Sequence, residues 1–334
     1  MAGAPYIDPP SRVSTTFAGD CDTFPPMSRG HFIGLNHHRL MLADQLRMEA
    51  YERAIAARVK PGMRVMDLGT GTGILALWAA RAGAEVVAVE PHAVIEVARR
   101  IAEDNDLAER IEFVRGDSRA IAPQGVDLVI TECMGNFFVT DEMQPVLRDL
   151  PRHLRGEVLT MPRRISLKVA AATLPMWREL SFWEEDIGGF DFSGALDFAS
   201  QAAYVVHCEP ELVTTDTATV ADFPLVESPD CLDLQASLAV QKSCTLHALV
   251  GWFDADLADG VVLSTAPGNR THWGQMVFPL PPTRVRAGDR VEAKIELAMD
   301  ESLRTHFRWH GKVVTAEGEI PFERDTRQRF GGAT

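Results

Sequence analysis

One stretch of the sequence, Val65-Met-Asp-Leu-Gly-Thr-Gly-Thr-Gly-Ile74, joins an apolar run to three closely spaced glycines. The apolar residues before Gly69 predict a buried strand, and the residues after Gly73 predict a helix. Glycines allow the backbone to approach a ligand closely, and a helix N-terminus offers unpaired N–H groups. The stretch therefore predicts a strand–turn–helix unit that can hold a cofactor at Gly69, Gly71 and Gly73.

The sequence around this turn alternates short apolar runs with helical patterns. Strands are predicted over residues 64–68, 85–89, 111–114 and 126–131, and helices over residues 39–59, 73–82 and 93–103. Alternation of this kind is typical of βαβ units and a parallel sheet. We therefore predict an α/β domain over residues 31–161. Residues 1–30 are rich in Pro, Ser and Thr without a period, so they are predicted to form a mobile arm.

The pattern changes after Met161-Pro162. Strands are predicted over residues 165–171, 232–240, 245–253, 276–280, 291–297 and 307–314, with no long helix between them. This order predicts an antiparallel β-barrel or sandwich over residues 162–334. Residues 177–200 interrupt the strands with an unusual number of aromatic side chains. Such a segment can project as an interface or pack back onto the barrel, and the sequence leaves both possibilities open.

Composition excludes several classes of protein. The 334 residues carry 47 acidic and 33 basic side chains and a formal charge of −14, which disfavours nucleic-acid and anionic-membrane binding. No apolar stretch approaches the roughly 20 residues that a membrane-spanning helix needs. The first residues show no secretory signal pattern. The five cysteines are scattered without a CxxC pair, so we expect no metal site, no disulfide framework and a cytoplasmic location.

Residues near the glycine turn indicate which cofactor it holds. Glu90 ends the next predicted strand, where an acid can accept the hydroxyls of a ribose. Ile74 stands where a dinucleotide fingerprint has its third glycine, and Asp67 would repel a pyrophosphate. An adenosyl ligand with a cationic sulfonium tolerates Asp67 well, so we favour S-adenosyl-L-methionine. A tight turn without any ligand is the alternative.

A second motif, Thr131-Glu-Cys-Met-Gly-Asn-Phe-Phe-Val-Thr-Asp-Glu-Met143, follows the fourth predicted strand. Glu132 lies at the carboxyl edge of the sheet, where open α/β folds bind ligands. Asp141 and Glu142 return nine and ten residues later, after an apolar stretch. Two carboxylates with apolar walls would clamp a planar guanidinium, which presents a fork of N–H donors. An ordinary charged surface loop is the alternative.

These motifs together resemble the protein arginine methyltransferase family, which uses a class I methyltransferase domain. The resemblance rests on Gly69–Gly73, Glu132–Met143, His38-Arg-Leu-Met-Leu-Ala-Asp-Gln-Leu-Arg47 and Thr271-His-Trp273, in the family's order. It implies a Rossmann-like parallel sheet followed by a β-barrel domain that carries a dimerisation arm at about residues 177–200. It also implies a homodimer.

The resemblance assigns roles to individual residues. Asp67, Gly69, Gly71, Gly73 and Glu90 correspond to the cofactor site. The helix over the cofactor contributes His38, Met41 and Arg47, with Arg47 pairing the cofactor's carboxylate. Glu132 and Asp141 correspond to the two acids of the double-glutamate loop, and His272 pairs with Asp44. The expected substrate side comprises Glu132, Met134, Asp141, Glu142, His272 and Trp273.

Three departures from the family pattern matter, two of them for the substrate and one for the cofactor. Asp141 is one methylene shorter than the usual glutamate, and Glu142 could replace it only if the loop shifted by one residue. A family Tyr-Phe-x-x-Tyr segment is replaced by Ser28-Arg-Gly-His-Phe32. Arg119 stands where many members have an acid facing the adenine, which makes Asp117 the substitute candidate.

The sequence therefore predicts an S-adenosylmethionine-dependent N-methyltransferase acting on the guanidino group of arginine. The shortened second acid and the missing tyrosines slightly favour free L-arginine or a small guanidino metabolite as substrate. Arginine in polypeptides is the alternative, and a catalytically inactive scaffold is the second. In the predicted reaction the acids align the guanidinium, and His272 with Asp44 accepts the released proton.

Overall fold

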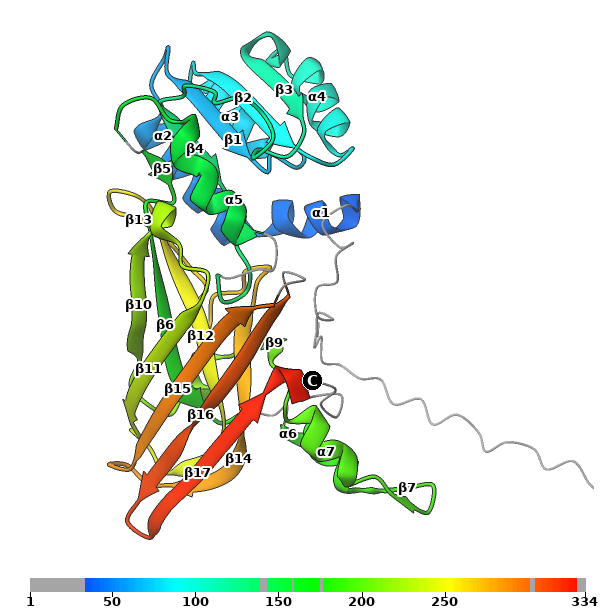
Figure 1. Cartoon of the computed structure of the whole chain (residues 1–334), viewed down its shortest axis with the longest axis vertical. Coiled ribbons are helices and arrows are strands. Elements are labelled where there is room, and N and C mark those ends of the chain that lie inside the picture. Colours follow the sequence, from blue (N-terminus) through cyan, green and yellow to red (C-terminus); the bar gives the residue numbers. More distant parts are fainter. Residues whose placement is uncertain (1–33, 139–142, 158, 175–176, 301–303, 329–334) are drawn as a thin grey trace, which may run out of the picture.

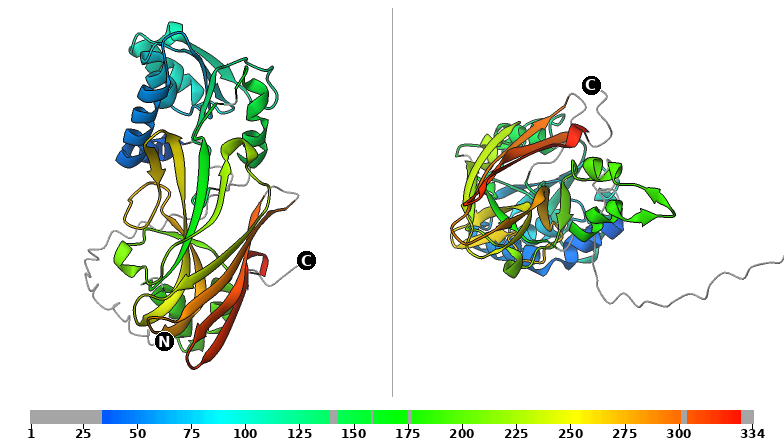
Figure 2. Two further views of the ribbon diagram at one scale, coloured as in Figure 1. Left: turned by 90° about the vertical axis from the view of Figure 1, so that its left-hand side faces the viewer. Right: turned by 90° about the horizontal axis from the view of Figure 1, so that it is seen from below.

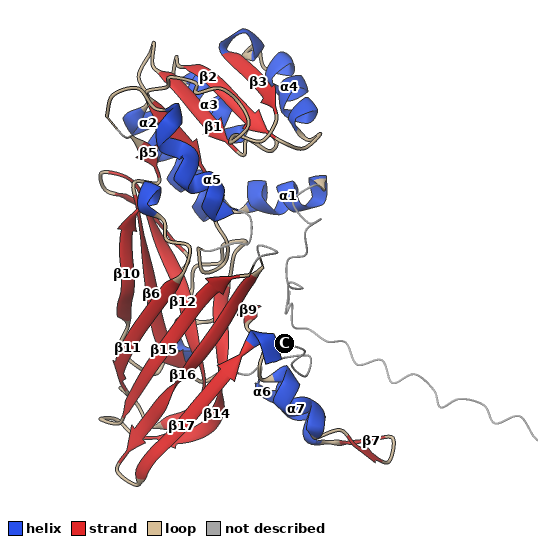
Figure 3. Cartoon of the chain, viewed as in Figure 1, coloured by secondary structure: helices blue, strands red, loops and turns tan. Residues whose placement is uncertain are grey.

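The computed structural model describes residues 34–138, 143–157, 159–174, 177–300 and 304–328 of the chain. Helices surround a sheet in one half of the molecule, and long strands make up the other half (Figure 3). The two halves are stacked along the long axis of the chain (Figure 1). Among the described residues, no helix combines the length and the apolar character that crossing a membrane requires.

The first half contains a parallel sheet with the strand order β3-β2-β1-β4-β5. These strands are β1 (Arg64–Leu68), β2 (Glu85–Glu90), β3 (Ile111–Arg115), β4 (Leu128–Thr131) and β5 (Thr160–Met161). The accompanying helices are α3 (Ile74–Arg81), α4 (Ile95–Asp104) and α5 (Met143–Asp149). The predicted Rossmann-like sheet is confirmed. Because the strand order reverses beside β1, ligands are expected at the carboxyl ends of β1, β2 and β4.

Two helices precede the sheet, α1 (Leu35–Ala43) and α2 (Gln45–Arg58), where the sequence predicted one helix over residues 39–59. The break falls at Asp44, whose backbone is extended. Its carboxylate caps α2 by accepting a hydrogen bond from the Arg47 N–H at 3.0 Å. An aspartate in this position satisfies an otherwise unpaired N–H, so it favours a helix start over a continuous helix.

The second half consists of two antiparallel sheets that face one another, as the sequence predicted for a β-rich domain. One sheet contains β10 (Ala218–Pro224), β6 (Arg164–Ala172), β12 (Cys244–Ala258), β14 (Gln275–Val285) and β9 (Tyr204–Val206), with β13 (Val261–Ser264) paired to β12. The other contains β11 (Leu232–Ala239), β15 (Arg290–Met299), β16 (Thr305–Thr315) and β17 (Gly318–Asp325). Phe278 packs against Phe307 and Trp309 across the two sheets.

A short projection leaves the β-rich domain and points away from it (Figures 1 and 2). It comprises α6 (Trp177–Ser181), the two-residue strands β7 (Asp186–Ile187) and β8 (Phe190–Asp191), and α7 (Gly194–Ala199). Four phenylalanines of this arm are exposed, and Phe190 retains 70% of its accessible surface. The others are Phe182, Phe192 and Phe198. The rings at its tip are therefore available to a partner.

Candidate functional site

The glycine turn lies at the carboxyl end of β1. Gly69, Gly71 and Gly73 all have positive φ, at 74°, 54° and 90°, a conformation that glycine adopts without steric cost. A Cβ at Gly71 would lie 2.7 Å from the ring of His38, and one at Gly69 would lie 2.7 Å from Cys133 Sγ. The turn is thus closely covered by α1 on one side and by the segment after β4 on the other.

Asp67 is buried at the end of β1 with one oxygen left over. Its Oδ2 accepts hydrogen bonds from the Thr70 hydroxyl at 2.6 Å and from the Ala76 N–H at 3.0 Å. Its Oδ1 is buried and has no hydrogen-bond partner among the described residues. Burial raises the pKa of Asp67 to about 6, against the lowering effect of those two hydrogen bonds. A buried carboxylate with a spare acceptor fits the ammonium group of an amino-acid ligand.

Glu90 lies at the carboxyl end of β2, beside the glycine turn. Its Oε2 accepts a hydrogen bond from the Gly71 N–H at 3.2 Å. Its Oε1 accepts two, from the backbone N–H of His92 at 3.0 Å and from the His92 ring at 2.7 Å. The sequence analysis did not single out His92. The only indication in the sequence was that His92 follows Glu90, the acid at the end of a predicted strand, by two residues.

Asp117 lies after β3 and is engaged by a neighbour. Both of its oxygens accept hydrogen bonds from the Arg119 side chain, at distances from 2.5 to 3.1 Å. These bonds hold the pKa of Asp117 below its usual value. Arg152 supports the same segment by donating to the carbonyls of Ser118 and Ile121. In this structure the Asp117 carboxylate is occupied by Arg119. Its expected contact with the adenine stays a prediction.

The covering helix α1 places His38 against the turn, beside Gly71. His38 and Met41 are both buried. The Met41 carbonyl accepts a hydrogen bond from Arg47 Nη1 at 3.2 Å, which ties the end of α1 to the first turn of α2. Of the two predicted residues of α1, His38 thus lies over the glycine turn and Met41 contacts Arg47.

Arg47 and Glu132 form the closest ion pair at the centre of the site. Arg47 Nε lies 2.5 Å from Glu132 Oε1, and both side chains are largely buried. Burial lowers the pKa of the Arg47 guanidinium, but the charge and the hydrogen bond of Glu132 raise it by more. The pKa of Arg47 therefore lies above its usual value. The family resemblance assigned Arg47 to the cofactor's carboxylate, a role that stays a prediction. In the structure Arg47 joins the covering helix to the predicted clamp acid.

His272 reaches the same centre from the β-rich domain. Its Nε2 lies 3.7 Å from Glu132 Oε1. Asp44 Oδ2 accepts hydrogen bonds from its backbone N–H at 2.8 Å and its ring Nδ1 at 2.9 Å. Burial raises the pKa of Asp44, but the hydrogen bonds from His272 and Arg47 outweigh it and hold that pKa below its usual value. An ionised Asp44 orients the ring with Nε2 towards Glu132.

Trp273 holds the segment after Glu132 in place through two hydrogen bonds. The Trp273 indole N–H donates to the Met134 carbonyl at 2.8 Å, and the Asn136 amide donates to the Trp273 carbonyl. Met134 itself is buried. Asn136, like His92, was not among the residues predicted to form the site. The two bonds fix the segment after β4 to the loop that carries His272.

Two phenylalanines anchor this segment in the β-rich domain. Phe137 and Phe138 are fully buried. Phe137 packs edge-on against Phe278, and a Cβ at Gly251 would lie 2.7 Å from its ring, so β12 needs glycine there. Phe138 packs against Phe223 and has a φ of +66°. Such a left-handed conformation in a bulky residue costs about 1–3 kcal/mol and is typical of functional sites.

Two further site residues of the sequence analysis, Asp141 and Glu142, lie outside the described residues. The choice between them as the second clamp acid therefore stays a prediction. The described residues that the structure brings together are Asp44, Arg47, Glu132 and His272, next to Asp67, Glu90 and the three glycines. They lie in or directly beside β1, β2, β4 and α2, and in the loop before β14.

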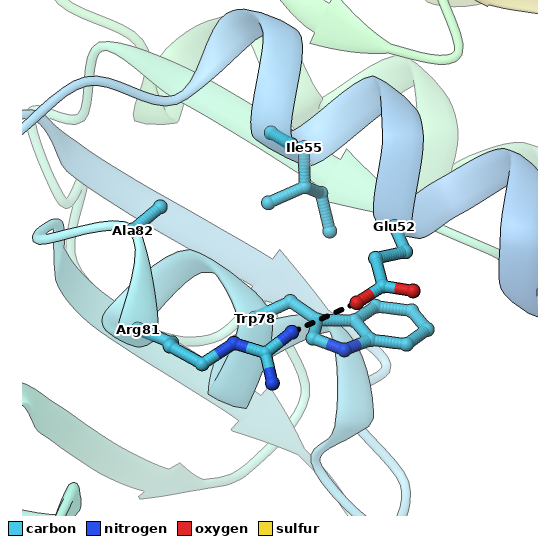
Figure 4. Close-up of a pocket in the computed structure, with 6 residues that line it drawn as sticks. Glu52, Ile55, Trp78, Arg81 and Ala82 are labelled. Atoms are coloured by element: carbon cyan, nitrogen blue, oxygen red, sulfur yellow. Dashed lines mark hydrogen bonds and ion pairs between the residues drawn. The ribbon is translucent and has the colours of Figure 1, made fainter.

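A hollow at the surface lies away from these residues. It measures about 220 Å³ and lies between α2 and α3, lined by Glu52, Ile55, Ala56, Trp78, Arg81 and Ala82 (Figure 4). Glu52 and Arg81 form an ion pair of 2.9 Å at its rim. None of the predicted site residues lines it, so we do not assign the reaction to this hollow.

The parallel sheet, its glycine turn and the acids at its carboxyl edge define a Rossmann-like methyltransferase with an appended β-rich domain. Two family models match the chain in this order. Residues 65–157 match a methyltransferase domain, and residues 166–310 match the arginine methyltransferase oligomerization subdomain.

Comparison with known proteins identifies the family within this class. Protein arginine N-methyltransferase 1 of Schizosaccharomyces pombe is 30% identical over 274 residues, which cover 77% of this chain and 80% of the relative. Protein arginine N-methyltransferase PRMT10 of Oryza sativa subsp. japonica is 29% identical over 81% of this chain and 82% of its own length. The solved PRMT1 enzyme–prozyme heterotetrameric complex of Trypanosoma brucei with AdoHcy superposes with a TM-score of 0.82. It shares 26% identity and covers 88% of this chain and 98% of that one. The chain belongs to the protein arginine methyltransferase family.

Proposed function

We propose that this chain transfers a methyl group from S-adenosyl-L-methionine to a guanidino nitrogen of arginine within a polypeptide. The observation that carries the proposal is the position of Glu132. Its carboxylate lies 2.5 Å from Arg47 Nε and 3.7 Å from His272 Nε2, at the carboxyl edge of the sheet that bears the glycine turn. A carboxylate in this place can hold a guanidinium against a ligand on the turn.

The cofactor site fits this donor. The spare buried oxygen of Asp67 accepts from the ammonium group, and Glu90 accepts from the ribose hydroxyls. The glycine turn leaves room for the backbone side of the ligand. When bound, S-adenosylmethionine supplies a methyl group on a positively charged sulfur. The side chains of the protein bind the cofactor, orient the substrate and accept the released proton.

Glu132 provides the alignment. A carboxylate offers about four acceptor positions, so it can bond Arg47 and a substrate guanidinium at once. When Glu132 accepts hydrogen bonds from the substrate N–H groups, positive charge is drawn away from the reacting nitrogen. The same bonds aim that nitrogen at the methyl carbon. The new N–C bond forms as the C–S bond breaks. Positioning of this kind contributes up to about 7–11 kcal/mol of barrier reduction.

His272 accepts the proton that the methylated nitrogen releases. Asp44 accepts from Nδ1–H, which leaves Nε2 as the acceptor on the side of Glu132. The proton can pass from there to solvent. The pair resembles in arrangement the acid–histidine pairs that orient general bases in other enzymes.

The choice of a polypeptide substrate is supported by the relatives, which are named protein arginine N-methyltransferases and match along most of their length. These names favour the alternative in our sequence analysis over the slight preference for free arginine. The shorter acid Asp141 and the departure at residues 28–32 prompted that preference, and both lie outside the described residues.

A competition experiment tests the substrate. The protein is incubated with methyl-labelled S-adenosylmethionine and equal amounts of free L-arginine and an arginine-containing peptide. We expect label in the peptide and little in free arginine, because a peptide adds binding contacts beyond the guanidinium. Label confined to free arginine would overturn the polypeptide proposal. Label in neither would favour an inactive scaffold and overturn the catalytic proposal.

We further propose that the chain is a homodimer in which the arm of one protomer packs against the helices of its partner. Four exposed phenylalanines on a projection would be costly in water, since a buried Phe side chain gains about 1.5–3 kcal/mol. The hollow beside Trp78, on the opposite half of the molecule, offers an apolar seat with a charged rim (Figure 4). One chain cannot fold its own arm onto it, because the β-rich domain separates them (Figure 1).

Light scattering of an arm variant tests this assembly. We expect Phe190→Ser to shift the protein from dimer to monomer at micromolar concentration, because Phe190 is the most exposed ring of the arm. The matched control Ile320→Ser removes an exposed apolar side chain of β17 and should leave the dimer intact. A wild-type monomer would contradict the proposal, as would an equal shift in both variants.

A further inference from the structure

His92 occupies an unusual place relative to the acid expected to bind the ribose. It lies directly after β2, and both its backbone N–H and its ring Nδ1 reach the same oxygen, Glu90 Oε1, at 3.0 and 2.7 Å. The ring bond forms an ion pair when the imidazole is protonated. The Glu90 side chain is 9% exposed and the His92 side chain 42%, so a half-exposed ring bonds a nearly buried carboxylate.

The three hydrogen bonds fix Glu90 in one orientation. A carboxylate only accepts, so the ring nitrogen facing Glu90 must carry a proton. Two of the donors are backbone groups, of which Gly71 bonds Oε2 and His92 bonds Oε1. The ring adds the shortest bond and is the only one of the three that a side-chain substitution removes. Without it, Glu90 would have more freedom to leave the glycine turn.

The electrostatics give His92 a second effect. Glu90 and Asp67 are neighbouring acids, and the charge of Glu90 contributes to the raised pKa of Asp67. A donor on Glu90 Oε1 disperses charge away from the turn. A charged or polarised hydrogen bond of this length is roughly twice as strong as a neutral one. The ring therefore favours the turn-facing orientation of Glu90, in which its carboxylate can accept from the ribose hydroxyls.

We propose that His92 is a positioning residue for the cofactor's ribose, acting through Glu90. The proposal rests on the proposed function, because it requires an adenosyl ligand on the glycine turn. The alternative is a local structural role, in which the ring only closes the connection between β2 and α4. The two roles differ in whether the loss of affinity depends on Glu90.

The test measures the Kd of S-adenosylhomocysteine by calorimetry, together with the Tm of the free protein. We expect His92→Ala to raise Kd about tenfold, because it removes one hydrogen bond to a charged group. His92→Asn should restore most of the affinity, since its amide can donate from nearly the same position. In a Glu90→Ala background, His92→Ala should cause no further loss. The matched control His310→Ala removes a ring of β16 that lies 4.0 Å from Glu296 of β15, and it should leave Kd unchanged.

Three results would overturn the proposal. One is a His92→Ala Kd within about twofold of the wild type, because a hydrogen bond to a charged group is worth more than that. Another is an equal loss with and without Glu90. The third is a fall in Tm with unchanged Kd, which would indicate the structural role. If the wild-type protein itself fails to bind S-adenosylhomocysteine, the proposed function fails, and this inference falls with it.

Discussion

Glu132→Gln should lower turnover about tenfold or more while cofactor affinity stays close to that of the wild type. Gln keeps the size of the side chain and can still accept from Arg47, but it loses the charge that holds a substrate guanidinium. The amide also presents an N–H₂ group, which would repel the N–H donors of the substrate. The change therefore acts on alignment and not on the glycine turn.

Three measurements separate this effect from unfolding. Steady-state kinetics with an arginine peptide give turnover, calorimetry with S-adenosylhomocysteine gives cofactor affinity, and thermal melting reports the fold. The matched control is Glu112→Gln, because Glu112 is an exposed acid of β3 that also pairs with an arginine, Arg64, at 3.4 Å. The control should behave as the wild type. Full turnover in Glu132→Gln would contradict the clamp.

Asp67→Asn should weaken cofactor binding about a hundredfold or more, because it leaves a buried ammonium group without its counter-charge. The same substitution should change how stability depends on pH. Burial raises the pKa of Asp67 to about 6 in the folded chain, against 3.8 as the ordinary value. The folded state therefore binds more protons than the unfolded state between those values.

The sign of the pH effect follows from that difference. Because the folded pKa is raised, the free energy of unfolding falls as pH rises from about 4 to 6, and the full penalty persists above pH 6. Two pKa units correspond to about 3 kcal/mol. Asp67→Asn removes this dependence, so the loss of stability between pH 4 and pH 7 should be about 2 kcal/mol smaller in the variant, because part of the effect falls below pH 4.

Denaturant unfolding at pH 4 and pH 7 measures this difference in the free protein, and calorimetry measures the affinity. Asp104→Asn, an exposed acid at the end of α4, is the matched control and should change neither quantity. Cofactor binding by Asp67→Asn at wild-type strength would contradict the assignment of the ammonium group to Asp67. If the stability of Asp67→Asn depends on pH as that of the wild type does, the claim that burial raises the pKa of Asp67 is contradicted.

The sequence predicted those parts of the fold that short-range patterns determine. The strand–turn–helix unit at Gly69–Gly73 requires only local periodicity and glycine chemistry, and β1 lies over the predicted residues 64–68. The strands β10 and β17 were missed. β10 is short and interrupted by Asp222, and β17 alternates charged residues with Pro321. Both are edge strands, where the apolar pattern is weak and proline is tolerated.

The site was predictable where residues lie at strand ends and unpredictable where they meet through packing. Asp67, Glu90 and Glu132 follow from the carboxyl-edge rule for parallel sheets. The contact of Asp44 with His272 joins residues 228 positions apart and rested on the family resemblance alone. Nothing in the sequence indicated that Arg47 would face Glu132, or that His92 would bond Glu90, because each depends on side-chain direction after folding.

The central claim is that Glu132 holds an arginine side chain for methyl transfer. The most direct measurement is mass spectrometry of an arginine-containing peptide after incubation with S-adenosylmethionine and either the wild type or Glu132→Gln. The account predicts a methyl group on a guanidino nitrogen with the wild type and almost none with the variant, at equal cofactor affinity. A methyl group on any other side chain, or equal methylation of arginine by both proteins, would contradict it.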